Sequence, residues 1–147
     1  MVTNLKNKVV NGWLKIKLEL EIMLIDKIKN NFNFLFSEYK FIPSNIEDEN
    51  NEWVLVLILG ELRLRFIEDR ANLFLDIGFV NAPTKWYEAV KVFQLINSME
   101  NIQEEVIVQN NIKSNRGLLK KYIKIMVDPT IQEKIVATKL SLSLGSE

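Results

Sequence analysis

The sequence contains neither cysteine nor histidine among its 147 residues. Without cysteine, the chain has no disulfides, no thiolate metal sites and no cysteine nucleophile. Without histidine, it lacks Ser-His-Asp and Cys-His chemistry, imidazole general-base catalysis and every zinc site that needs imidazole. Only carboxylate chemistry remains, as an acid pair or a hard-metal site. We therefore expect a protein that is not an enzyme and holds no cofactor or metal.

Long apolar runs and an excess of either charge are also lacking. The longest uninterrupted apolar run, Trp53 to Leu59, has seven residues, whereas a membrane helix needs about 20. The first ten residues lack the apolar core of a signal peptide. Nineteen basic and nineteen acidic residues give a formal net charge of zero, which is atypical of a nucleic-acid or membrane-surface binder. These absences predict a cytoplasmic protein with neither a membrane nor a nucleic acid among its partners, and the length of 147 residues predicts a single domain.

The stretch from Trp53 to Gly78 predicts its own strand pairing. Its first run is rich in β-formers, and Gly60-Glu61 after it suits a type II′ hairpin turn. A second turn follows at Asp69–Asn72. Closing both turns aligns these pairs on one apolar face: Leu59 with Leu62, Leu57 with Leu64, Leu55 with Phe66, Phe66 with Leu75, and Leu64 with Ile77. The same register places Asp76 opposite Arg65 on the other face, so we predict a three-stranded antiparallel meander.

The second face of this meander mixes charged and apolar side chains. Arg63, Arg65 and Asp76 favour water, yet five apolar residues share their face: Val54, Val56, Ile58, Ile67 and Phe74. One interpretation covers both faces with the chain's own helices. The other makes those five residues an interface for a partner or a second copy, because contiguous exposed apolar patches usually mark interfaces.

Helical spacing of apolar residues brackets the meander on both sides. Residues 1–12 read as a polar arm, and a helix over 13–37 has its apolar face at Leu14, Leu18, Ile22, Ile25, Ile28 and Phe32. The aromatic cluster at its end could line a ligand pocket, but its spacing favours core packing: Phe32, Phe34, Phe36, Tyr39 and Phe41. Residues 39–42 suit an edge strand or an extended connection, and 43–52 a loop.

The C-terminal part of the chain predicts further helices. Thr84 is the expected N-cap of a helix over 85–98, and residues 100–108 suit either a helix or a strand. Another helix should end at Asp128-Pro129, where a last helix begins, and 141–147 read as a polar tail. The predicted fold class is α+β: an N-terminal helix, a meander of three to four strands, and two to four helices packed on the sheet, all within residues 13–140.

Charge is uneven along the chain. Four acids gather in the 43–52 loop without a base: Glu47, Asp48, Glu49 and Glu52. They lack the framework of an EF-hand, so they form either a solvated loop or a docking site for a basic partner. Residues 113–127 carry five bases and no acid; a solvated helix face explains them better than phosphate contacts. Four meander acids are the only alternative for a carboxylate enzyme site: Glu61, Glu68, Asp69 and Asp76.

The order of elements resembles small bacterial α+β proteins of the immunity-protein type, which are encoded beside toxins. The resemblance spans residues 18–98 and rests on Phe34 to Phe41, Arg63 to Phe66 and Trp86 to Val90. It implies stoichiometric binding that blocks another protein, with no turnover. The four acids of the 43–52 loop are the preferred contact, because many cytotoxic nucleases are basic. The alternative is a structural or adaptor module that forms a homodimer through the apolar residues of the second sheet face.

Overall fold

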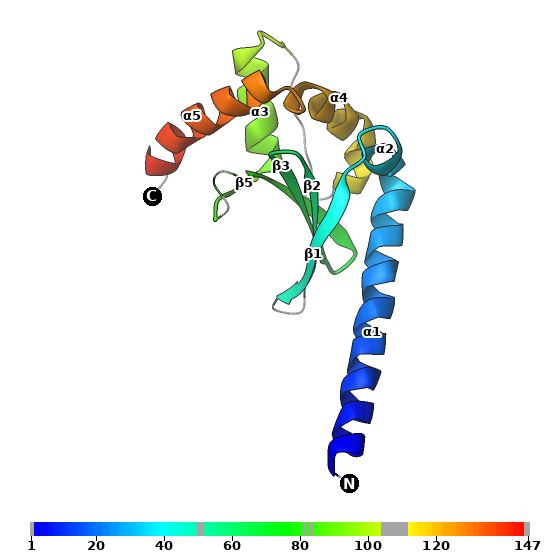
Figure 1. Ribbon diagram of the computed structural model, residues 1–147. Helices are drawn as coiled ribbons and strands as arrows, with labels where there is room; N and C mark the ends of the chain where they lie inside the picture. Colours follow the sequence, from blue (N-terminus) through cyan, green and yellow to red (C-terminus); the bar gives the residue numbers. More distant parts are fainter. Residues whose placement is uncertain (1, 50–51, 81, 83, 104–111, 146–147) are drawn as a thin grey trace.

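A computed structural model describes residues 2–49, 52–80, 82, 84–103 and 112–145 of the chain (Figure 1). Its elements follow in this order: α1 (Val2–Asn31), α2 (Asn33–Ser37), β1 (Ile42–Glu49), β2 (Glu52–Leu59), β3 (Leu62–Asp69), β4 (Asn72–Phe79), β5 (Trp86–Glu88), α3 (Ala89–Met99), the 3-10 turn η1 (Ile112–Asn115), α4 (Arg116–Met126) and α5 (Pro129–Gly145). In this part of the chain the strands form one antiparallel sheet, in the order β1-β2-β3-β4-β5. The predicted α+β fold class is confirmed.

The predicted meander register is confirmed pair by pair. Leu55 lies opposite Phe66, which lies opposite Leu75 across the next ladder. The inner-face residues of β3 are fully buried while Arg63 and Arg65 between them are half-buried. Alternation with period two therefore sets which face enters the core. On the other face, Arg65 and Asp76 are paired as predicted, with an Nη2–Oδ2 distance of 2.5 Å.

The two turns of the predicted meander, between β2 and β3 and between β3 and β4, differ in backbone conformation. Gly60 has a φ of 58° whereas Glu61 has no positive φ, as the predicted type II′ turn requires. The second turn has two central residues, Arg70 (φ 51°) and Ala71 (φ 69°), between the paired Asp69 and Asn72. Two positive φ values are typical of a type I′ turn, which favours Asn-Gly. Neither Arg70 nor Ala71 is suited to that conformation.

We expect Ala71→Gly to stabilise the protein by about 0.5–1 kcal/mol. Glycine removes the left-handed strain, and the gain is partly offset by its larger entropy in the unfolded chain. Chemical denaturation of the two proteins measures the difference. Gly60→Ala is the converse control and should destabilise the fold, since Gly60 also has a positive φ. Stability that is unchanged or lower in Ala71→Gly would contradict a strained turn.

Two segments form strands where the sequence predicts other structure. The prediction of a loop over residues 43–52 is wrong, because β1 continues through Pro43 to Glu49 and pairs with β2. The register of this pairing shifts between Pro43 and Asn45. Proline is tolerated there because β1 is an edge strand. The helix predicted over 85–98 begins only at Ala89, since Trp86 to Glu88 pair with β4 as strand β5. Thr84 is therefore not its N-cap.

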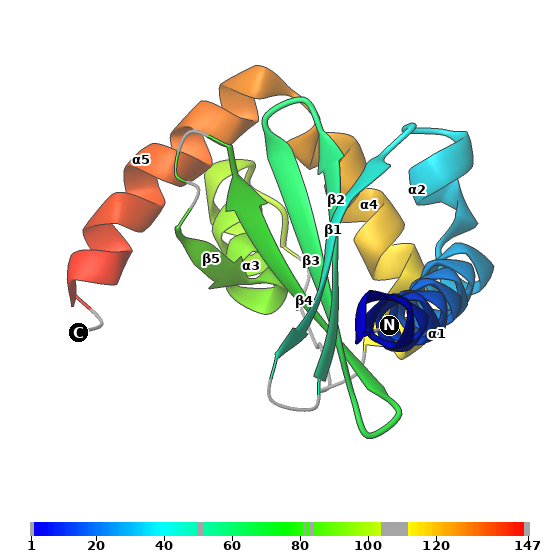
Figure 2. The same ribbon diagram turned by 60° about the horizontal axis from the view of Figure 1, so that its bottom comes forward.

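The helices pack against one face of the sheet (Figure 2). The core joins the inner strand residues to α3, α4 and α5 and to the C-terminal part of α1, through residues such as Leu24, Phe93, Tyr122 and Ile135. The predicted start of α5 is confirmed, because Thr130 N donates to Asp128 Oδ1 at 2.9 Å. The sheet is therefore an open one, with helices on one side in the described part of the chain.

Both ends of the chain are more helical than the sequence predicts. α1 begins at Val2, so residues 2–12 continue the helix instead of forming a separate arm, and α5 runs to Gly145 through much of the predicted tail. α1 ends at Asn31, and α2 follows after Phe32, whose ring stacks on Phe66 with centroids 5.6 Å apart. The aromatic cluster is core, as predicted: Phe32, Phe34 and Phe41 are buried, and Phe36 and Tyr39 pack against them.

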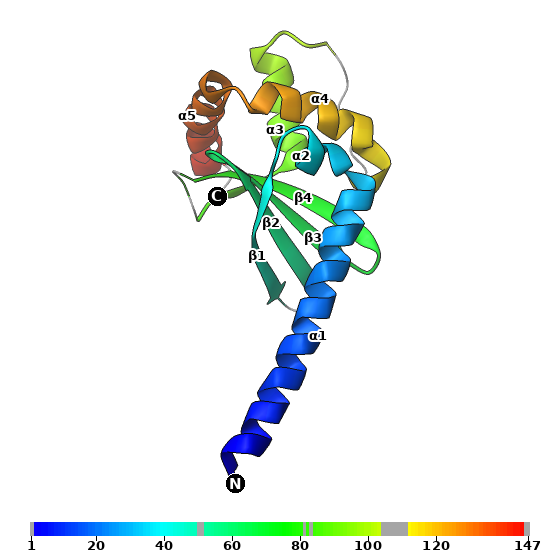
Figure 3. The same ribbon diagram turned by 45° about the vertical axis from the view of Figure 1, so that its right-hand side comes forward.

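The predicted apolar face of the first helix is buried only in its second half. Ile28 and Phe32 are fully buried, but Leu18 is 56 % exposed and Ile22 58 % exposed. The reason is geometric, since the first half of α1 extends past the sheet (Figures 1 and 3). The surface that α1 presents to the sheet carries Leu24 in addition to Ile28 and Phe32.

Trp86 shapes the outer face of the sheet. It pairs with Gly78 across β4 and β5, and a Cβ on Gly78 would lie 2.9 Å from Trp86 Cε3 and 3.1 Å from Arg63 Nη2. The Arg63 and Arg65 guanidinium carbons lie 4.3 and 4.5 Å from the Trp86 ring centroid. Only glycine leaves room for this stack of indole and guanidinium groups.

We expect Gly78→Ala to destabilise the protein by about 1–3 kcal/mol, because the new methyl group forces Trp86 off the sheet. Gly117→Ala in α4 is the matched control. A Cβ there meets nothing within 4 Å, so alanine should stabilise the helix by about 0.5–1 kcal/mol. Urea unfolding followed by circular dichroism measures both changes. Equal effects of the two substitutions would contradict close packing at Gly78.

Candidate functional site

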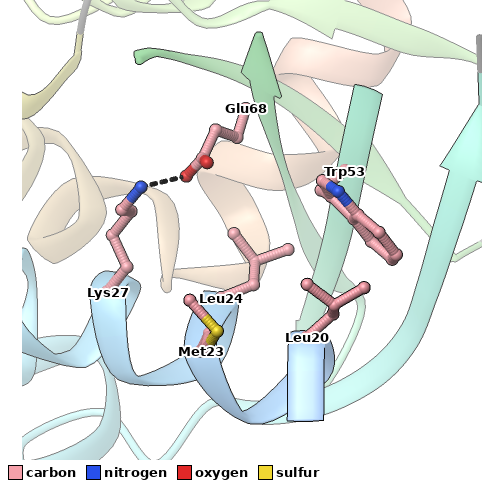
Figure 4. A pocket seen from close by; sticks show the side chains of 6 residues that line it. All are labelled: Leu20, Met23, Leu24, Lys27, Trp53 and Glu68. Atoms are coloured by element: carbon pink, nitrogen blue, oxygen red, sulfur yellow. Dashed lines mark hydrogen bonds and ion pairs between the residues drawn. The ribbon is translucent and has the colours of Figure 1, made fainter. Parts of the chain in front are cut away.

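A small apolar groove lies where α1 leaves the sheet (Figure 4). Leu20, Met23 and Leu24 line it from α1, and Trp53 closes it from the start of β2. Lys27 and Glu68 complete the lining and form an ion pair across it. The groove thus joins α1 to the start of β2 and the end of β3, which are far from α1 in sequence.

Helix and strand periodicity bring these side chains together. Residues 20, 23, 24 and 27 are spaced by three or four positions and share one side of a helix. Trp53 has the same parity along β2 as Leu55 and Leu57, so it lies on the inner face, at the end of the strand. Leu24 is buried here while Met23 is 65 % exposed. The groove therefore marks the point where the core opens to solvent.

The ion pair forms the polar wall of the groove. Lys27 Nζ lies 2.7 Å from Glu68 Oε2, and the two side chains are 38 % and 23 % exposed. Its partial burial makes it stronger than a fully exposed pair, although solvent still screens it. The pair also ties α1 to the end of β3.

The four predicted acids lie at the end of the sheet that borders the groove. β1 and β2 place the backbone of Asp48 opposite Trp53 and that of Glu49 opposite Glu52, with Glu47 opposite Val54. The side chains of Glu47, Asp48, Glu49 and Glu52 lie outside the described residues. Glu68 and Asp69 end the neighbouring strand β3. The ends of β1, β2 and β3 thus bring several acidic residues to the end of the sheet where the groove lies.

The sequence alone did not single out Leu20, Met23 or Lys27. One signal was present, since α1 carries a second apolar stripe beside the predicted one: Ile16, Leu20, Met23 and Leu24. A helix that is apolar on two sides is usually covered on both. The packing of α1 decided which residues of each stripe are buried. Leu24 of this stripe and Ile28 of the predicted one enter the core.

The predicted oligomer face is less open than the sequence implies. Val54 is 4 % and Val56 9 % exposed, while Ile58, Ile67 and Phe74 are half-buried. The half-buried side chains of Arg63, Arg65 and Trp86 lie on the same face. Burial, and secondarily the charge of Arg65, lowers the pKa of the Arg63 guanidinium. This face is a mixed polar and apolar surface, and its use as an interface stays a prediction.

The four carboxylates considered for catalysis do not converge. Glu61 lies in the turn between β2 and β3, and Asp69 lies at the other end of β3; eight strand residues separate such ends by about 25 Å. Asp76 binds Arg65 on the outer face, and Glu68 binds Lys27 at the groove. Within the described residues, no three acids are grouped so that they could hold a metal ion.

The basic stretch of residues 113–127 is divided between several contacts. Lys120 pairs with Glu38 at 3.2 Å, and Lys113 Nζ donates to Ala71 O at 3.5 Å. Lys124 and Arg116 are exposed. In the described part of the chain, these bases therefore do not form one surface dedicated to phosphate.

Comparison of this chain with protein-family models, curated proteins and solved structures finds no match. Among the described helices, none combines the length and apolar character needed to cross a bilayer. The function of the chain must therefore be inferred from its own residues.

We expect a measurable coupling free energy between Lys27 and Glu68, of about 0.5–1 kcal/mol, because the pair is short and partly buried. A double-mutant cycle with Lys27→Met and Glu68→Gln measures it by urea unfolding. The control cycle uses Lys120→Met and Glu38→Gln, a pair at 3.2 Å with both side chains 51 % exposed. Its coupling should be smaller. Equal couplings in the two cycles would show that the groove gives the ion pair no added strength.

Proposed function

We propose that this chain is a non-catalytic protein-binding module that inhibits another protein by stoichiometric binding. The observation that carries the proposal is the apolar groove at Met23 and Trp53, bordered by the acidic end of β1 and β2. An apolar pocket with a charged rim is the usual composition of a protein interface. The resemblance in layout to immunity proteins supports the inhibitory role.

The chemistry of the site indicates what kind of partner it accepts. Leu20, Met23 and Trp53 form a surface for one apolar anchor side chain, and methionine adapts readily to differently shaped partners. The acidic strand ends would attract lysine or arginine beside that anchor. A basic nuclease, which a cell must neutralise, is the kind of partner that we propose.

A homo-oligomeric adaptor is the second candidate function. Ile42 supports it, because this residue is 68 % exposed and pairs with Ile58 at the edge of the outer sheet face. Such an adaptor would contact its partner through this edge and not through the groove. Variants at the two surfaces distinguish the two functions.

The test is affinity capture from the lysate of the organism that encodes the chain, followed by quantitative mass spectrometry. Wild type is compared with Met23→Glu and with a variant in which Glu47, Asp48, Glu49 and Glu52 become Gln or Asn. Ile42→Glu is the matched control, since Ile42 and Met23 are exposed to similar extents. We expect wild type to capture one partner at a 1:1 ratio, and Ile42→Glu to capture it equally well. Met23→Glu and the neutralised variant should each bind this partner at least about tenfold less well.

Salt provides a second measure in the same experiment. If the acids attract a basic partner, raised salt should weaken capture by wild type more than capture by the neutralised variant. A partner lost only with Ile42→Glu would favour the outer edge and the adaptor function. Partner binding that none of these substitutions weakens would overturn the groove as the binding site.

A further inference from the structure

The first half of α1 carries an exposed apolar seam on the side opposite the groove. Leu18 and Ile22 are 56 % and 58 % exposed, and neither lines the groove. Each lies six residues before a buried residue, Leu24 or Ile28, which corresponds to about 120° around a helix. This part of α1 extends past the sheet (Figures 1 and 3). The seam therefore faces away from the core of its own chain.

The charges around Leu18 have opposite signs on its two sides. The segment Lys15-Ile-Lys-Leu-Glu-Leu-Glu21 reads as base, apolar, base, Leu18, acid, apolar, acid. Reversing its direction exchanges every base for an acid and keeps every apolar position apolar. Lys15 and Glu19 are exposed, and Glu21 is half-buried.

We infer that a second copy of this chain docks on the seam, with the two α1 helices antiparallel and crossing at Leu18. In that arrangement Lys15 of one copy lies beside the glutamates of the other, while Leu18 meets Leu18 across the two-fold axis. Ile22 of each copy extends the apolar contact on one side of the axis. A two-fold interface is self-complementary in this way, because one patch serves both subunits.

The charge pattern selects this arrangement over its alternatives. A parallel pair in register would place lysine beside lysine and glutamate beside glutamate, which is unfavourable. An unrelated protein could cover the apolar seam, but the exact reversal of charge about Leu18 is matched by the chain itself. The groove lies on the other side of α1, so this dimer forms whether or not the proposed function at the groove is correct.

The first test is the mass of the full chain in solution, measured by light scattering during gel filtration. We expect a dimer for wild type and a monomer for Leu18→Glu, because two carboxylates would meet on the two-fold axis. Ile16→Glu is the control on the same helix; Ile16 is 52 % exposed but lies on the groove side, so this variant should stay dimeric. A monomeric wild type, or equal masses for the two variants, would overturn the inference.

Charge exchange tests the electrostatic contribution. The variant Lys15→Glu/Lys17→Glu is acidic throughout the segment, and Glu19→Lys/Glu21→Lys is basic throughout. Each alone should be monomeric, and their equimolar mixture should give a dimer. If each of these two variants formed a dimer by itself, the charges would not contribute to dimer formation.

Engineered cysteines test the orientation, since the natural chain has none. Leu18→Cys should crosslink into a disulfide dimer under mild oxidation. Ile22→Cys should not, because an antiparallel pair centred on Leu18 separates the two Ile22 positions by about 12 Å along the helix axis, beyond disulfide reach. Crosslinking at both positions would indicate a parallel pair, and crosslinking at neither would exclude the contact; either result overturns the inference.

Discussion

The fold depends on one constraint, which is that the central strands must bury one face completely. Leu55, Leu57, Leu64, Phe66 and Ile77 are all fully buried, and each such side chain contributes roughly 1.5–3 kcal/mol of hydrophobic free energy. A shift of one residue in a ladder would turn the apolar side chains of the shifted strand to the other face of the sheet. The tight two-residue turns and the pairing of Arg65 with Asp76 are consistent with that register and reinforce it.

One-sided burial also explains where the two proposed binding surfaces lie. Because the helices pack on one face, the sheet keeps an outer face on which Trp86 and two arginines stack, and its end beyond the helices stays open. α1 is longer than the sheet is wide, so it covers the inner face only with its second half. The groove at Trp53 forms where the helix and the sheet diverge. The exposed seam at Leu18 forms beyond that point, on the part of α1 that the sheet does not support.

The two proposed interfaces therefore have a common structural origin. One side of α1 and the sheet form the groove at which we propose that another protein binds, while the opposite side carries the apolar, charge-reversed seam that we propose for a second copy. A dimer through α1 would leave both grooves facing away from the two-fold contact, and binding at one surface need not block the other. A stoichiometric inhibitor of this kind would present two equivalent binding sites.

The sequence by itself determined the meander, its register, its first turn and the start of α5, because these follow from local patterns: alternation with period two, a glycine at a positive φ, and an Asp-Pro helix start. It did not determine strand β1, since an acidic segment with a proline pairs only because the apolar edge of β2 lies beside it. The strand at Trp86 was not determined by the sequence either. Its aromatic residues suit a helix or a strand, and the pairing of Trp86 with Gly78 makes this segment a strand. The sequence did not predict the groove or the seam either. α1 has two apolar stripes, and only the tertiary structure shows that Leu24 of one stripe and Ile28 of the other enter the core, while Leu18 stays in solvent.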